Sequence, residues 1–91
     1  MEKNAELFRT LQSLVDAWCD RRCLSALRYV LKGYPLTSPM TDGWAELLTA
    51  LQDVRAFART ELTEQERIMV DDCIRAVDRV VYRQEGSRKR L

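Results

Sequence analysis

Large apolar side chains recur along this chain at intervals of three and four residues. Because an α-helix turns once in 3.6 residues, such spacing places these side chains on one face of a helix. Four separate stretches show this pattern, and no stretch alternates apolar and polar residues as a half-buried β-strand does. The chain is therefore predicted to be all-α.

Residues that cap or interrupt helices divide the four stretches. Asp20 follows the first apolar face and can act as the N-cap of a second helix. Gly33 is predicted to end that helix in the left-handed C-cap conformation, and Pro35 cannot extend it. Thr63 and Glu66 have the spacing of a capping box, in which each side chain accepts a hydrogen bond from the other residue's backbone N–H. This pair predicts the start of the last helix.

The expected helices cover roughly residues 4–19, 21–33, 42–60 and 63–84. The pattern leaves open whether the first two are separate or form one bent helix. Four amphipathic helices with short connections pack most economically as a bundle. We therefore expect a small antiparallel four-helix bundle with one domain over residues 1–84, followed by a flexible basic tail over residues 85–91.

The predicted core consists of the apolar faces of these helices. On the second helix that face is expected to contain Leu24, Leu27, Val30, Leu31 and Tyr34. Arg55 falls within the apolar face of the third helix, where a charge needs a partner or a path to solvent. It is expected to pair with an acid such as Asp72 or Asp16, or to extend past the edge of the bundle.

The residue types argue against catalysis and metal binding. The chain has no histidine and only three glycines, so it lacks the commonest general base and any glycine-rich phosphate loop. Cys19, Cys23 and Cys73 do not form the close CxxC pairs of zinc sites, and Cys73 lies on an apolar face where burial is expected. We therefore expect no enzyme activity, no cofactor and no metal.

The cellular location is predicted from the cysteines and from the first residues. An odd number of cysteines suits a reducing compartment. The first six residues lack the basic-then-apolar form of a secretory signal, and no apolar run approaches the roughly 20 residues that cross a bilayer. We expect a cytoplasmic protein with no membrane partner.

Basic residues are concentrated in one part of a chain whose formal net charge is only +1. Residues 21–40 contain four basic residues and no acidic one. Within this segment Arg22, Arg28, Tyr29 and Lys32 are predicted to form a partner-binding face, because tyrosine and arginine are favoured at protein interfaces. An acidic protein is the expected partner. Two alternatives stay open, namely nucleic acid and an ordinary solvated face.

Two further contact regions are predicted. Ile68, Arg75 and Tyr82 recur every seven residues on the side of the last helix away from its core face, as on a helix that meets another helix. A homodimer through this helix is therefore expected, the alternative being exposed residues without a role. Leu36 and Met40, in the loop over residues 34–43, are predicted to present an edge to the partner of the second helix.

These features together predict a small bacterial-type protein that acts by binding another protein, as an adaptor, co-chaperone, antitoxin-like protein or anti-activator. The alternative is a regulator that associates with nucleic acid through the second helix and the basic segment Arg88–Arg90. The ten-residue loop after the second helix differs from the short turn of a helix-turn-helix, which argues against specific DNA recognition.

Overall fold

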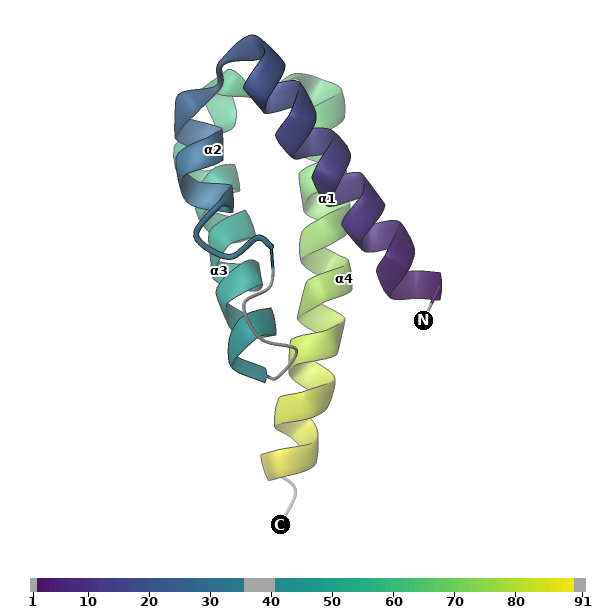
Figure 1. Cartoon of the computed structure of the whole chain (residues 1–91). Helices are drawn as coiled ribbons and strands as arrows, with labels where there is room; N and C mark the ends of the chain where they lie inside the picture. Colours follow the sequence, from purple (N-terminus) through teal and green to yellow (C-terminus); the bar gives the residue numbers. More distant parts are fainter. Residues whose placement is uncertain (1, 36–40, 90–91) are drawn as a thin grey trace.

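The computed structural model describes residues 2–35 and 41–89, with side chains described over residues 5–35 and 43–82. These residues form four α-helices and a short 3-10 helix, and they contain no strand (Figure 1). The elements are α1 (Glu2–Arg21), α2 (Leu24–Val30), α3 (Thr41–Phe57), η1 (Arg59–Glu61) and α4 (Glu64–Lys89). The predicted all-α bundle is confirmed. None of the described helices is both long enough and apolar enough to cross a membrane.

The core lies where α1, α2, α3 and α4 face one another. Successive helices run in opposite directions, and α3 packs against both α2 and α4 (Figure 1). Apolar faces predicted for the first, third and fourth helices are buried or half-buried. The largest side chains with almost no exposure are Trp18, Leu11, Leu14, Leu47, Leu51, Val30, Val54, Val70 and Val77. Burial of this single apolar cluster holds the helices together.

A Schellman motif separates α1 from α2. Arg22 has a φ of 58°, in the left-handed region that normally follows a helix end. The backbone N–H of Cys23 donates to the carbonyl of Trp18 at 2.8 Å, and that of Arg22 donates to the carbonyl of Cys19 at 3.2 Å. The two helices are thus separate. The predicted boundary was too early, by two residues at the end of the first helix and by three at the start of the second, because Asp20 lies inside α1 and Cys23 is the N-cap residue of α2.

Gly33 is needed because the turn after α2 packs closely on the backbone of α3. It does not adopt a left-handed conformation. No glycine among the described residues has a positive φ, so the predicted left-handed C-cap at Gly33 is wrong. A Cβ added there would lie 2.6 Å from the carbonyl oxygen of Glu46 and 2.7 Å from the Cα of Leu47. Only glycine allows the turn after α2 to approach the backbone of α3 this closely.

Helix α4 continues to Lys89, beyond the predicted end near Gln84. Gly86 lowers helix propensity by about 1 kcal/mol, but the residues around it are mostly good helix formers and do not stop the helix. Basic residues near the C-terminus also suit the negative end of the helix dipole. The end of α4 projects past the other helices (Figure 1). Flexibility of the segment over residues 85–91 stays a prediction.

Candidate functional site

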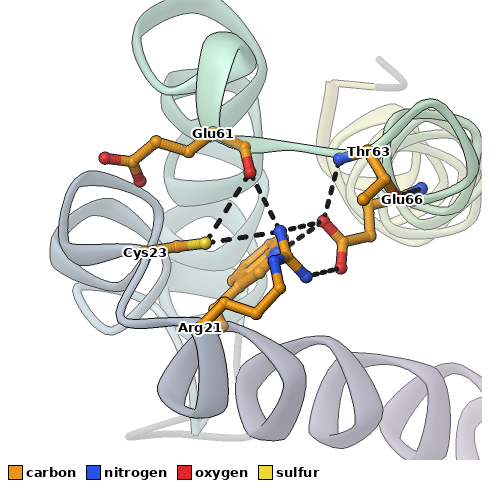
Figure 2. Close-up of polar contacts among 6 residues, drawn as sticks. Arg21, Cys23, Glu61, Thr63 and Glu66 are labelled. Carbon is orange, nitrogen blue, oxygen red and sulfur yellow. Dashed lines mark hydrogen bonds and ion pairs between the residues drawn. The ribbon is translucent and has the colours of Figure 1, made fainter.

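Arg21, the last residue of α1, joins this helix to the start of α4 (Figure 2). Its Nη1 lies 2.5 Å from Oε2 of Glu66, and its Nη2 lies 2.9 Å from Oε1. Oε1 also accepts hydrogen bonds from Nε1 of Trp18 at 3.2 Å and from the backbone N–H of Thr63 at 3.0 Å. The hydroxyl of Thr63 accepts from the N–H of Glu66 at 3.0 Å, which confirms the capping box. A buried carboxylate is thereby fully hydrogen-bonded.

The electrostatics of this pair keep both groups ionised. The hydrogen bond from Arg21 holds the pKa of Glu66 below its ordinary value, against the opposing effect of burial, and the bonds from Thr63 and Trp18 act in the same direction. The hydrogen bond to Glu66 raises the pKa of Arg21. A hydrogen-bonded pair that is charged at neutral pH is suited to holding elements in place and not to proton transfer.

Glu61, at the end of η1, fixes the position of α2. Nη2 of Arg21 donates to the backbone carbonyl of Glu61 at 3.0 Å, and Sγ of Cys23 donates to the same oxygen at 3.6 Å. The carboxylate of Glu61 points away from Arg21 (Figure 2) and accepts from the backbone N–H groups of Ala26 at 3.0 Å and Ser25 at 3.4 Å. Cys23 provides no side-chain cap, so Glu61 satisfies donors at the start of α2 that would otherwise be unpaired.

The orientation imposed on α2 leaves two leucines in solvent. Ala26 and Val30 are completely buried and define the inner side of α2. Leu24 and Leu31 are 70% and 53% exposed. They are seven residues apart and therefore lie on the same side of the helix, with the exposed Arg28 between them along the axis.

An aromatic pair connects α2 to the end of α3. The rings of Tyr29 and Phe57 have centroids 5.6 Å apart, and Phe57 is 66% exposed. Nζ of Lys32 lies 5.3 Å from the centroid of the Tyr29 ring, a cation–π contact. The end of α3 thus adds an exposed aromatic ring to the surface of α2.

We refer to the exposed residues Leu24, Arg28, Leu31 and Lys32, together with the Tyr29–Phe57 pair at their edge, as the α2 outer face. Within this face Tyr29 is half-buried against the core. This face contains two basic residues and no acidic one. A shallow groove beside Lys32 runs along α3 and includes the acidic residues Glu46 and Asp53. The combination of exposed aliphatic, aromatic and basic side chains is typical of a protein-binding surface.

The structure brings together three of the four residues predicted for the basic face. Arg28 and Tyr29 lie on α2, Lys32 lies in the turn directly after it, and the exposed Arg22 lies in the turn before it. The predicted loop residues Leu36 and Met40 lie outside the described residues.

The other predicted contact residues form a separate surface on α4. Ile68 and Tyr82 are 51% and 76% exposed, and Arg75 is also exposed. Nη2 of Arg75 lies 2.5 Å from a carboxylate oxygen of Asp72, one turn earlier on the same helix.

The assignment of Leu24 and Leu31 to the core was wrong. It assumed a longer second helix over residues 21–33, whereas α2 has seven residues and packs through Ala26 and Val30. Small side chains allow the close approach to α3, but they give a weak hydrophobic signal. The spacing of Cys23, Ala26 and Val30, at i, i+3 and i+7, already described this inner side.

Arg55 is paired, but with a different acid from those expected. Its Nη1 lies 3.2 Å from a carboxylate oxygen of Asp71, which neighbours the predicted partner Asp72. Both side chains are about half exposed, so the pair lies at the bundle edge and not within the core. Such an exposed ion pair contributes little to stability.

The cysteines are unpaired. Cys19 is exposed, while Cys23 and Cys73 are buried. Burial raises the pKa of the Cys73 thiol to about 11, and the nearby Asp72 adds to this effect. Over residues 5–35 and 43–82, no three histidine, cysteine, aspartate or glutamate residues are grouped as metal ligands would be. Comparison with known protein families, curated proteins and solved structures finds no match.

Proposed function

We propose that this protein acts by binding another protein, and that the α2 outer face is the contact surface. The exposure of Leu24 and Leu31 on one side of a firmly held helix carries this proposal. Exposed aliphatic side chains that lie in line on one side of a helix favour a surface that a partner covers.

The partner segment that fits best is an amphipathic helix with acidic flanks. Leu24 and Leu31 are two helical turns apart, about 10 Å, which matches the i and i+7 positions of a second helix. Carboxylates beside the apolar side chains of such a helix would meet Arg28 and Lys32. Charge of this kind steers association and fixes orientation, while burial of the leucines supplies affinity.

The rigidity of α2 supports this role. Glu61 holds its first turn, and Gly33 permits close contact between the turn after α2 and α3. A surface that is already ordered before binding loses little conformational entropy when the partner arrives. Seven residues would be marginal as an isolated helix, so these tertiary contacts are what make α2 usable as a binding element.

A nucleic-acid partner is less well supported. Phosphate groups are bound by cations and do not need exposed leucines. Only Arg28 and Lys32 are basic on the α2 outer face, which is few cations for a phosphate backbone. Roles such as adaptor, co-chaperone, antitoxin-like protein or anti-activator are all forms of the protein docking proposed here.

Affinity purification from cells that naturally produce the protein tests this function. The baits are the wild type, a Leu24→Glu, Leu31→Glu double variant, and Ser13→Glu as a control at an exposed residue of α1. Circular dichroism verifies that all three are folded. Each sample is divided, and one half is treated with nuclease.

We expect at least one protein to co-purify with the wild type and with the control. The amount of this protein recovered with the double variant should be at least tenfold lower. This difference should survive nuclease, and the purified pair should bind directly with the same dependence on the leucines. The proposal is contradicted if no protein depends on Leu24 and Leu31, or if nuclease abolishes the dependence. The latter result would instead indicate nucleic acid.

A further inference from the structure

The side of α4 opposite the core carries a regular row of exposed residues. We refer to Ile68, Asp72, Arg75, Arg79 and Tyr82 as the α4 outer row; all five are exposed. Their spacings of four, three, four and three residues are those of the contact positions of a coiled coil. Because α4 packs on α3 and α1 through its other side, the row is left without a described neighbour from another helix.

We propose that the α4 outer row pairs with the same row of a second copy, in antiparallel orientation. In this arrangement Asp72 of each copy faces Arg79 of the other, and Ile68 of each copy packs beside Tyr82 of the other. Both pairs are centred near residue 75, so one two-fold axis satisfies them together. The self-complementary order of charge along the helix is what identifies a second copy as the partner.

The charges also select the orientation. In a parallel pair, Asp72 would face Asp72 and Arg79 would face Arg79, which places like charges opposite one another. The antiparallel pair brings two Arg75 side chains near the axis, but each is paired with Asp72 of its own helix at 2.5 Å. This ion pair reduces the repulsion between the two guanidinium groups.

The size of the contact predicts a weak, reversible dimer. The row extends over about 21 Å of helix, and Ile68 and Tyr82 are its two apolar members. A contact of this extent falls in the class of small, transient interfaces. The pairing is independent of the α2 outer face, because the two surfaces share no residue.

Analytical ultracentrifugation over protein concentrations from about 10 μM to about 1 mM tests the dimer. This range covers the dissociation constants of weak interfaces. We expect the wild type to self-associate, and Asp72→Arg or Arg79→Asp alone to weaken association at least tenfold. The Asp72→Arg, Arg79→Asp double variant should restore it, as should an equimolar mixture of the two single variants. Asp16→Arg, an equal charge change at an exposed residue of α1, should have no effect.

A second variant pair tests the apolar contacts. Ile68→Lys, Tyr82→Lys should abolish association while leaving the fold intact, because both residues are exposed. The proposal is overturned if the wild type remains monomeric throughout the concentration range. It is equally overturned if the folded charge-swapped double variant fails to recover the association that each single variant loses.

Discussion

The guanidinium group of Arg21 contacts both carboxylate oxygens of Glu66, which lies 45 residues away in the sequence. Because Glu66 also caps α4, one carboxylate fixes the start of the last helix and the turn from which α2 emerges. The direction in which α2 presents Leu24 and Leu31 therefore depends on this buried acid together with Glu61, which holds the first turn of α2.

Replacement of Glu66 by alanine is predicted to destabilise the fold by about 2–4 kcal/mol. The change removes one half of the capping box and leaves the buried Nε1–H of Trp18 without its acceptor. Urea unfolding measures the loss. Thr63→Ala, which removes only the hydroxyl cap, should cost about 1 kcal/mol. Equal effects of the two variants would contradict the role assigned to Glu66.

The stabilising effect of Glu66 should disappear in acid. Its pKa is lower in the folded state than the ordinary 4.5, so its contribution is complete above that value and is lost as the pH falls through the lowered folded pKa. Urea unfolding of the wild type and Glu66→Gln between pH 7 and pH 3 tests this. The stability difference should be constant above about pH 5 and should shrink below pH 4.5. A difference that does not change with pH would disprove the linkage.

Gly33→Ala is predicted to destabilise the protein by about 1–3 kcal/mol, because the added Cβ would overlap backbone atoms of Glu46 and Leu47. A glycine-to-alanine change at negative φ normally stabilises a protein, because it lowers the conformational entropy of the unfolded chain. A loss of stability at Gly33 therefore requires steric overlap in the folded state. Gly86→Ala, inside α4, is the matched control and should be neutral or stabilising. Thermal unfolding compares the two. Stabilisation by both variants would rule out the close approach.

The three thiols should differ in reactivity. Cys19 is exposed, whereas Cys73 is buried and has a pKa of about 11, so only about one Cys73 in a thousand is a thiolate at pH 8. Brief treatment with iodoacetamide, followed by peptide mass mapping, should find Cys19 alkylated and Cys73 unmodified. In 6 M guanidinium, a standard denaturing condition, all three thiols should react. Equal rates for Cys19 and Cys73 in the folded protein would contradict the burial of Cys73.

The long helices could be predicted because large apolar residues and a capping box mark them directly. Trp18, Leu51 and Val77 occupy the core positions that their spacing indicates. Thr63 and Glu66 make the reciprocal hydrogen bonds that their sequence pattern predicts. Signals of this kind depend only on local sequence, so they do not require knowledge of the tertiary structure.

The position of α2 could not be predicted in the same way. It depends on Ala26, whose small side chain gives no strong pattern, and on Gly33, whose function is close approach and not turn geometry. The hydrogen bonds from Glu61 and the contact between Arg21 and Glu66 connect residues at least 35 positions apart. The basic residues of the candidate site were therefore found from sequence, while its exposed leucines and Phe57 were not.

Photo-crosslinking inside the producing cells tests the proposed α2 contact most directly. A p-benzoyl-phenylalanine residue is introduced in place of Leu24, Leu31 or, as an exposed control on α1, Ser13. Positions 24 and 31 should give adducts with the same protein, position 13 should not, and Arg28→Glu should weaken both adducts. Identical background at all three positions, or adducts with nucleic acid at positions 24 and 31, would contradict a protein-binding α2 outer face.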